Sequence, residues 1–323
     1  TARVEFVRLR ILILVFVSLL LAACGGKTIE KEVSTTVTYQ VAKPAPKRAP
    51  ARVAPAVTAG DLIMTKLVGP APTAEELAAV RSLNLGGVIL FGWNVQDATQ
   101  LTAFTKQLQT ARAARATATK RPVTLLVSVD QEGGAIRNVP FAPPEHTQPE
   151  IAADTSIDPR SVGSATAVGL RKVGVNMDLG PVADLASPPN RTMAGRSFGS
   201  DPDDVAGFVG QTVAGMVSGK VVPTAKHFPG FGASTANSDD GIAYIDRTLE
   251  ELRGSELLPF QSAVTYKSPA IMVSHGILRA EGRTLPGTVD PYVATKLLRD
   301  ELEFDGVAIT DSMNAKGFRD AWG

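Results

Sequence analysis

The sequence predicts an α/β fold, a TIM-type (β/α)8 barrel that lacks its last strand. First, short apolar runs rich in β-branched residues alternate with longer amphipathic runs from Asp61 onward, which is typical of βα units around a parallel sheet. Second, most of the short runs end in polar or ionisable residues, as strands do at the mouth of a barrel. Third, the segment after the first strand run, KLVGPAPTAEEL, lacks the glycine-rich phosphate turn of the alternative fold, a doubly wound open sheet.

The composition excludes several classes of protein. The 323 residues include 33 Lys and Arg against 32 Asp and Glu, and this net charge of +1 argues against a nucleic-acid partner. A hydrophobic share of 44% with a charged share of 20% excludes disorder for most of the length. One cysteine and three histidines exclude a disulfide framework and a multi-cysteine zinc site, so we predict no metal.

The first 23 residues predict an export signal. Three arginines precede an uncharged apolar run at 11–23, which is too short to span a bilayer as a settled helix. The tetrapeptide LAAC, ending at Cys24, resembles a bacterial lipobox, in which the cysteine is lipidated. An ordinary signal peptide with an incidental cysteine is the alternative. We expect a secreted lipoprotein anchored to the extracytoplasmic face of the cell membrane, because the sole cysteine lies where lipidation needs it.

Residues 24–57 predict a linker, and residues 58–323 predict the folded barrel domain. The linker is rich in Pro and Ala without an amphipathic period, which favours an extended, semi-rigid spacer between the membrane and the domain. In the domain, helix start signals follow the strand runs, such as Thr73 with Glu75 and Glu76, and Asp201 with Pro202. The predicted strands are 62–67, 87–91, 123–129, 176–179, 222–226, 270–273 and 306–310.

An eight-stranded barrel needs one strand more than these seven. The chain ends 12 residues after Asp311 and begins with Thr in place of Met. We therefore expect a fragment of a longer reading frame, with an open edge that favours instability or association.

Polar clusters at the predicted strand ends carry the candidate chemistry. Asp130 begins DQEGG, where two carboxylates suit bidentate hydrogen bonds to sugar hydroxyls, and the alternative is a solvated turn with a capping Asp. The segment NMDLGPVADL buries Asp178 or Asp184 among apolar residues, where an unpaired carboxylate costs several kcal/mol. Each is as well explained by a structural arginine partner as by a substrate. Lys226 and His227 begin KHFPGFG, whose cationic and imidazole groups beside glycines suit an oxygen-rich ligand.

Five motifs, taken in order, resemble the N-terminal barrel of family 3 glycoside hydrolases. They are DQEGG, RSFGSDP, KHFPG, MVSH and GVAITDSM, and the resemblance covers nearly all of residues 60–323. The single-domain bacterial β-N-acetylglucosaminidase (β-N-acetylhexosaminidase) branch matches best, in size and in the 85-residue interval from Lys226 to Asp311. The resemblance implies hydrolysis of terminal β-linked N-acetylglucosamine from cell-wall glycans, without a cofactor and by a monomer.

The resemblance also implies roles for individual residues. Asp311 matches the aspartate nucleophile of a retaining mechanism, and a carboxylate that ends an apolar strand at a barrel mouth suits attack on an anomeric carbon. The residues that match substrate ligands are Asp130, Arg196, Lys226, His227 and His275.

One departure from the family concerns the general acid. The family carries an Asp-Ser-His triplet after KHFPG, and its histidine is the acid/base, whereas the triplet here is Asn237, Ser238 and Asp239. A carboxylic acid can replace the histidine if its pKa is raised, so Asp239 or Asp240 is the candidate. Three interpretations stay open: an active exo-glycosidase using one of these carboxyls, a glycosidase for another sugar with an acid from elsewhere, and a pseudoenzyme that binds cell-wall sugar.

Trp93, directly after the second predicted strand, has two interpretations. Its indole ring suits stacking on a sugar ring, and packing at the rim of the barrel explains it about as well.

Overall fold

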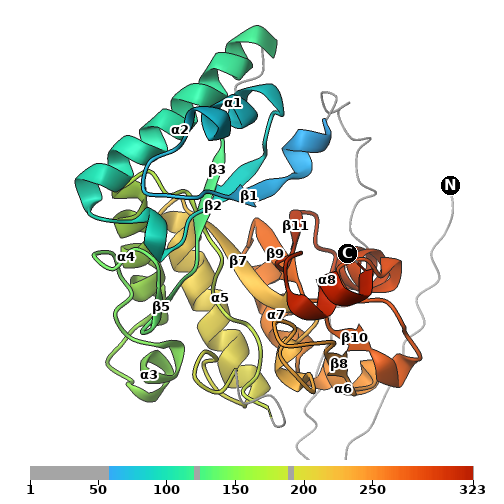
Figure 1. Cartoon of the computed structure of the whole chain (residues 1–323). Coiled ribbons are helices and arrows are strands. Elements are labelled where there is room, and N and C mark those ends of the chain that lie inside the picture. The colour runs from blue at the N-terminus through green and yellow to red at the C-terminus, as the bar shows by residue number, and fades with distance from the viewer. Residues whose placement is uncertain (1–57, 120–123, 188–192, 323) are drawn as a thin grey trace, which may run out of the picture. The chain divides into compact units, whose positions relative to one another are not determined.

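The computed structural model describes residues 58–119, 124–187 and 193–322 (Figure 1). The predicted export signal, Cys24 and the linker lie outside the described residues. The domain that begins near residue 58 is therefore the part of the chain considered below.

A parallel sheet of seven strands forms the centre of the described domain. Its order is β1-β2-β3-β6-β7-β9-β11, every neighbouring pair is parallel, and β1 and β11 are the two edges. Each of the seven strands lies within or overlaps a predicted run, so the predicted strands are confirmed. The strands are β1 (Met64–Lys66), β2 (Gly87–Ile89), β3 (Leu126–Val129), β6 (Met177–Asp178), β7 (Val222–Phe228), β9 (Ala270–Val273) and β11 (Val307–Thr310).

Helices follow the strands and begin where the sequence places their caps. Thr73 accepts a hydrogen bond from the backbone N–H of Glu76, and Asp201 accepts from those of Asp203 and Asp204. The helices are α1 (Ala74–Ser82), α2 (Ala98–Thr119), α3 (Gln148–Ala153), α4 (Pro159–Lys172), α5 (Pro202–Ser218), α6 (Leu249–Gly254), α7 (Leu257–Thr265), the π-helix η5 (Tyr292–Glu301) and α8 (Lys316–Trp322). Repeated strand-then-helix units make every sheet connection a crossover, which explains the parallel pairing.

Apolar side chains cover both faces of the sheet. One face packs against the helices, in a core that includes Phe104 of α2 and Val209 of α5. On the other face, Met177 and Met272 pack with side chains from both edge strands, including Met64 of β1 and Ile309 of β11. Strands at opposite edges share one small cluster only if the sheet curls around it, which is the arrangement of a barrel interior. The predicted barrel that lacks its last strand is therefore the architecture of the described residues.

Two short strand pairs lie beyond the central sheet and were not predicted. The antiparallel hairpin of β4 (Gln131–Gly133) and β5 (Ile136–Arg137) contains the DQEGG segment. The parallel pair of β8 (Tyr244–Ile245) and β10 (Ile277–Leu278) joins the segments that follow β7 and β9. Both pairs lie after the carboxyl ends of central strands, so they shape the same edge of the sheet as the predicted site residues.

Candidate active site

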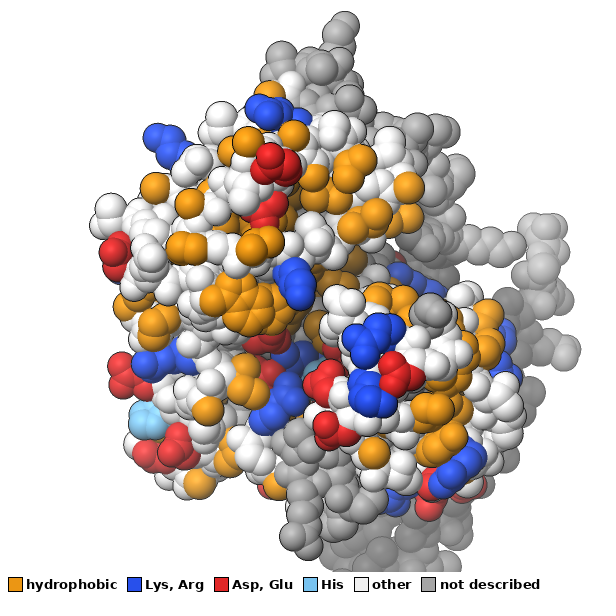
Figure 2. All heavy atoms as spheres, viewed as in Figure 1, with side chains coloured by type: hydrophobic (Ala, Val, Ile, Leu, Met, Phe, Trp, Pro, Cys, Tyr) orange, Lys and Arg blue, Asp and Glu red, His pale blue; other side chains and the backbone are white. Residues whose placement is uncertain are grey.

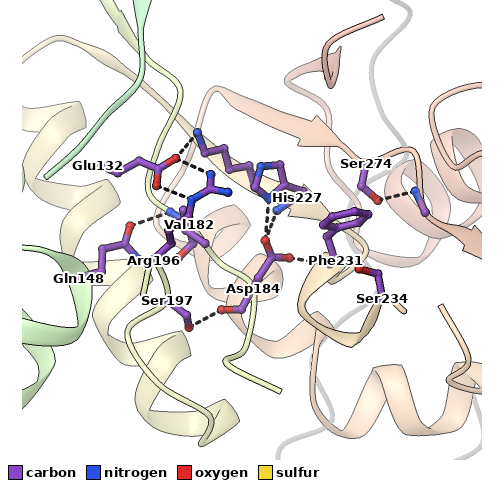
Figure 3. A network of polar contacts seen from close by, with 12 residues as sticks. Glu132, Gln148, Val182, Asp184, Arg196, Ser197, His227, Phe231, Ser234 and Ser274 are labelled. Atoms are coloured by element: carbon purple, nitrogen blue, oxygen red, sulfur yellow. Dashed lines mark hydrogen bonds and ion pairs between the residues drawn. The ribbon is translucent and has the colours of Figure 1, made fainter. Parts of the chain in front are cut away.

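An ion cluster joins the carboxyl ends of β3 and β7. The ammonium of Lys226 lies 2.7 Å from Asp130 Oδ1 and 2.6 Å from Glu132 Oε1. The guanidinium of Arg196 donates two parallel hydrogen bonds to the Glu132 carboxylate, of 2.8 and 2.7 Å. Three residues predicted in separate motifs, Asp130, Arg196 and Lys226, thus meet in one place. Glu132 connects Arg196 with Lys226, and Figure 3 shows Glu132 beside Arg196.

Burial and charge pairing oppose one another in this cluster. The side chains of Lys226 and Glu132 are 3% and 4% exposed. Burial alone raises the pKa of Glu132, but the charges of Lys226 and Arg196 outweigh it and lower that pKa to about 2. Burial likewise lowers the pKa of Lys226, and the carboxylates of Asp130 and Glu132 reverse the effect and raise it well above its usual value. All three groups are therefore charged near neutral pH.

Only one of the two DQEGG carboxylates is open to a ligand. Glu132 is enclosed by its two cationic partners, whereas the Asp130 side chain is 22% exposed. The expectation that both carboxylates bind sugar hydroxyls is corrected here, because Glu132 uses its oxygens to hold Lys226 and Arg196. Red and blue side chains gather in a hollow of the face drawn in Figure 2, near the β7 and α8 of Figure 1, with hydrophobic side chains along its border.

His227 is held by a fully buried carboxylate. Asp184 Oδ2 lies 2.6 Å from His227 Nδ1, and it also accepts the His227 backbone N–H at 3.2 Å. The other oxygen of Asp184 accepts the backbone N–H of Phe231 at 2.6 Å. Asp184 therefore fixes both ends of the KHFPGF turn, and its partner is a histidine, neither the arginine nor the substrate that the sequence left open. His227 Nε2 has no hydrogen-bond partner among the described residues, so that atom can meet a ligand.

The same turn needs glycine at one position. Gly230 has φ +125°, a conformation that L side chains rarely adopt. A Cβ on Gly230 would lie 2.4 Å from Cβ of the buried Glu256. The turn after β7 therefore packs against Glu256 at Gly230, and hydrogen bonds to Asp184 hold it at His227 and Phe231.

Asp178 lies fully buried beside the ion cluster. Its Oδ1 accepts the backbone N–H of Gln131 at 3.1 Å, and Oδ2 has no partner within the described part of the chain. It lines a small cavity with Thr166 and Thr212. Of the two alternatives left open for Asp178, no arginine pairs with it in the described ranges. Burial raises the pKa of Asp178 well above its usual value, against the opposing charge of Lys226.

Asp311 follows β11 at the same edge of the sheet. Its backbone N–H donates to the carbonyl of Val273 on β9, and its carboxylate accepts the N–H of Ser312 at 2.7 Å. The side chain is partly exposed, as a nucleophile must be. Register with β9 thus fixes the backbone of Asp311 at the end of the strand.

His275 supports the Asp311 loop from below. Nε2 lies 2.9 Å from the carbonyl oxygen of Ser312, so it must carry the proton, and Nδ1 lies 2.8 Å from the hydroxyl of Thr288. The residue is 3% exposed, and the ring of Phe318 lies 4.6 Å from its own. Both ring nitrogens are therefore engaged with the protein, and the predicted contact between His275 and substrate has no free ring nitrogen to make it.

The loop of the candidate acid is held by α8. The backbone N–H of Gly317 donates to the carbonyl of Ser238, and a Cβ on Gly317 would lie 2.0 Å from the carbonyl oxygen of Gly241. Asp239 itself is exposed, and its backbone N–H donates to Asn237 Oδ1 at 3.1 Å. No hydrogen bond or ion pair joins Asp239 to the other predicted site residues in the described ranges.

Some functional contacts had no signal in the sequence. Glu132 was visible as a carboxylate in DQEGG, but its two cationic partners were not. Thr288 and Asn138 carry no motif, although Asn138 donates two hydrogen bonds to the carbonyl of Asp130 and accepts one from Gly92. No group of three His, Cys, Asp or Glu side chains is placed to hold a metal ion in the ranges described above.

The chain is similar to proteins of one family. The model of the glycosyl hydrolase family 3 N terminal domain matches residues 56–323. A beta-hexosaminidase from Alkalilimnicola ehrlichii is 31% identical over 259 residues, which are 78% of this chain and 72% of that protein. Beta-hexosaminidase A from Pseudoalteromonas piscicida is 28% identical over 77% of this chain, which spans only 44% of that longer protein.

A solved structure agrees in fold. The family 3 beta-N-acetylglucosaminidase from Paenibacillus superposes with a TM-score of 0.76 at 28% identity, covering 83% of this chain and 52% of that one. The curled parallel sheet, the order of its motifs and these similarities lead to one conclusion. This chain belongs to glycosyl hydrolase family 3, whose N-terminal domain it contains.

Proposed function

We propose that this domain is a retaining exo-glycosidase that removes terminal β-linked N-acetylglucosamine from cell-wall glycans or their fragments. The observation that carries the proposal is the convergence of a paired ion cluster and a partly exposed aspartate at one edge of the sheet. The curated relatives named above are beta-hexosaminidases, and they support the choice of sugar.

Charge balance in the cluster suits an uncharged sugar. Asp130 and Glu132 offset the charges of Lys226 and Arg196. Hydroxyl groups can then be bound by charged donors and acceptors without a net charge to neutralise. The groups available to them are the Asp130 carboxylate, the partly exposed Arg196 guanidinium and His227 Nε2.

In the proposed mechanism Asp311 attacks the anomeric carbon. The bond from that carbon to the leaving oxygen breaks as the bond to the Asp311 carboxylate forms, and an acid protonates the leaving oxygen. Water then attacks the same carbon and releases Asp311, while the acid, now a base, takes the proton of the water. The candidate for this acid is Asp239, with Asp240 as the alternative.

A second candidate function is sugar binding without turnover. The exposure of Asp239, and its lack of contact with the other site residues in the described ranges, favour this candidate. The ion cluster and His227 would serve a binding protein as well as an enzyme, so the two candidates differ only in the steps after binding.

We also propose that the domain is held at a membrane by a lipid on Cys24. The support is the basic, apolar and LAAC pattern of residues 1–24, followed by a Pro- and Ala-rich segment. Among the residues that the structure describes, no helix is long and apolar enough to cross a bilayer.

Replacing Asp311 by Asn should abolish turnover and leave the fold intact. The amide oxygen can still accept the N–H of Ser312, but an amide cannot attack the anomeric carbon. We expect phenol release from aryl β-N-acetylglucosaminide to fall by about a thousandfold or more. Asp305→Asn, at an exposed position near the same strand, is the control and should keep wild-type rates. Turnover by Asp311→Asn near the control rate would exclude Asp311 as the nucleophile.

Replacing Asp239 by Ala should separate substrates by their leaving groups. An activated dinitrophenyl glycoside needs little protonation, so its hydrolysis should fall less than about tenfold, while a methyl glycoside should lose about a hundredfold or more. Asp240→Ala, made beside it, should affect neither substrate. Equal losses on both substrates in Asp239→Ala would mean a structural role, and the selective loss in Asp240→Ala would move the acid to that residue.

Replacing Asp178 by Asn should change how stability depends on pH. Folding binds the Asp178 proton more tightly, so this group stabilises the wild type below its unfolded pKa and loses that contribution as the pH rises toward the raised, folded pKa. The Asn variant lacks this loss. Its free energy of unfolding, relative to that of the wild type, should therefore rise between pH 5 and pH 7 by up to about 1.4 kcal/mol per pH unit. Urea unfolding at both pH values measures it, and a difference independent of pH would refute a neutral Asp178.

Replacing Cys24 by Ser should release the full-length protein from the membrane. The wild type should partition into the detergent phase of a Triton X-114 extract, and the variant should move to the aqueous phase because it carries no lipid. Partition of both proteins into the same phase would contradict the anchor.

A further inference from the structure

Trp93 is an exposed aromatic side chain on the loop after β2. It is 55% exposed, and the ring of Phe91 stacks on it with centroids 4.4 Å apart and an interplanar angle of 18°. Phe91 therefore covers one face of the indole, and the opposite face is open to solvent. An aromatic face that is open to solvent can bind an apolar surface of a ligand.

The loop holds the indole in one orientation. Trp93 Nε1 donates to the carbonyl of Leu67, which follows β1, and the fully buried Asn94 donates to the same carbonyl and to that of Gly69. The other end of the Asn94 amide accepts the N–H of Phe91 at 2.9 Å. Because these bonds fix the ring before any ligand arrives, little side-chain entropy remains to be lost on binding.

The same loop is connected to the ion cluster. The N–H of Gly92 donates to Asn138 Oδ1 at 2.9 Å, and the side-chain and backbone N–H groups of Asn138 both donate to the carbonyl of Asp130. One asparagine thus bridges the residue before Trp93 and the residue whose carboxylate holds Lys226. β2 also pairs directly with β3, so both loops leave the same edge of the sheet.

The open face of Trp93 offers a ligand an apolar surface, unlike the cluster. The indole N–H is already used by Leu67, so the ring offers a face and no hydrogen bond to a ligand. Such a surface suits the C–H face of a pyranose ring, whereas charged donors and acceptors such as Arg196 and Asp130 suit its hydroxyls.

We propose that the open face of Trp93 binds the second sugar ring, the one on the leaving-group side of the scissile bond. The inference rests on the proposed function, which places the terminal sugar at the ion cluster. The open face of Trp93 contacts a ring face and no hydroxyl. It therefore favours a second sugar, of any configuration, over an alkyl leaving group. The natural substrate is then a disaccharide or a longer glycan.

Intrinsic fluorescence tests the contact directly, because Trp93 and Trp322 are the two tryptophans of the chain. In the non-hydrolysing Asp311→Asn background, N,N′-diacetylchitobiose should change the emission, and N-acetylglucosamine alone should change it much less. Adding Trp93→Phe should abolish the change, while adding Trp322→Phe, the matched control, should preserve it. Emission that does not respond to the disaccharide, although calorimetry shows both sugars binding, would overturn the inference and leave the proposed function standing.

Kinetics of the active protein give a second, independent measurement. Trp93→Ala should raise KM for N,N′-diacetylchitobiose about tenfold and leave kcat/KM for the methyl β-N-acetylglucosaminide within about twofold. Trp93→Phe retains a ring stacked on Phe91, so its KM for the disaccharide should lie between the values of the wild type and Trp93→Ala. This variant is the control for a loop that fails to fold in Trp93→Ala. Equal losses on both substrates in both variants would overturn the inference, and so would failure of the wild type to bind either sugar, which would also remove the proposed function.

Discussion

The site depends on a buried ammonium held between two carboxylates. Lys226 is 3% exposed, so its desolvation is expensive, and the ion pairs with Asp130 and Glu132 offset that cost. Those pairs tie β7 to the hairpin after β3, and Glu132 extends the tie to Arg196 before α5. Three segments distant in sequence are therefore held by one charge network, and removing Glu132 would leave Arg196 without its carboxylate partner and Lys226 with Asp130 alone. The orientation of the groups that we propose to bind sugar is a consequence of this pairing.

Much of the fold followed from local sequence. The seven strands were predicted because buried parallel strands are short apolar runs, and the helix starts because Thr73 and Asp201 carry capping signals. The β8 and β10 strands were missed, since each is two residues long and pairs with a segment more than thirty residues away. The prediction of seven strands in the central sheet, one fewer than a complete barrel has, was also correct for the described residues.

The candidate site was predicted in its positions better than in its contacts. Asp130, Lys226 and Asp311 lie at strand ends, where a parallel sheet must bring them to one edge. The contact partners of these residues were harder to predict, because the turns between strands decide which side chains meet. Asp184 pairs with a histidine, which was neither of its two predicted partners, and His275 supports a loop. Membership of glycosyl hydrolase family 3 agrees with the motif order, and the proposed acid, Asp239, lies exposed.

Helix α8 touches both loops that carry the proposed chemistry. Gly317 lies against the backbone at 238–241, and Phe318 lies against His275, which in turn holds the carbonyl of Ser312. During synthesis on a ribosome, segments emerge from the N-terminal end first. The sheet can begin to curl as its strands appear, but the loop of Asp239 must wait for some eighty further residues before the helix that positions it exists. The proposed acid and nucleophile loops thus assemble late and together, and a nascent chain stalled within β11 would contain the residues of the Lys226 ion cluster before it contained Asp311.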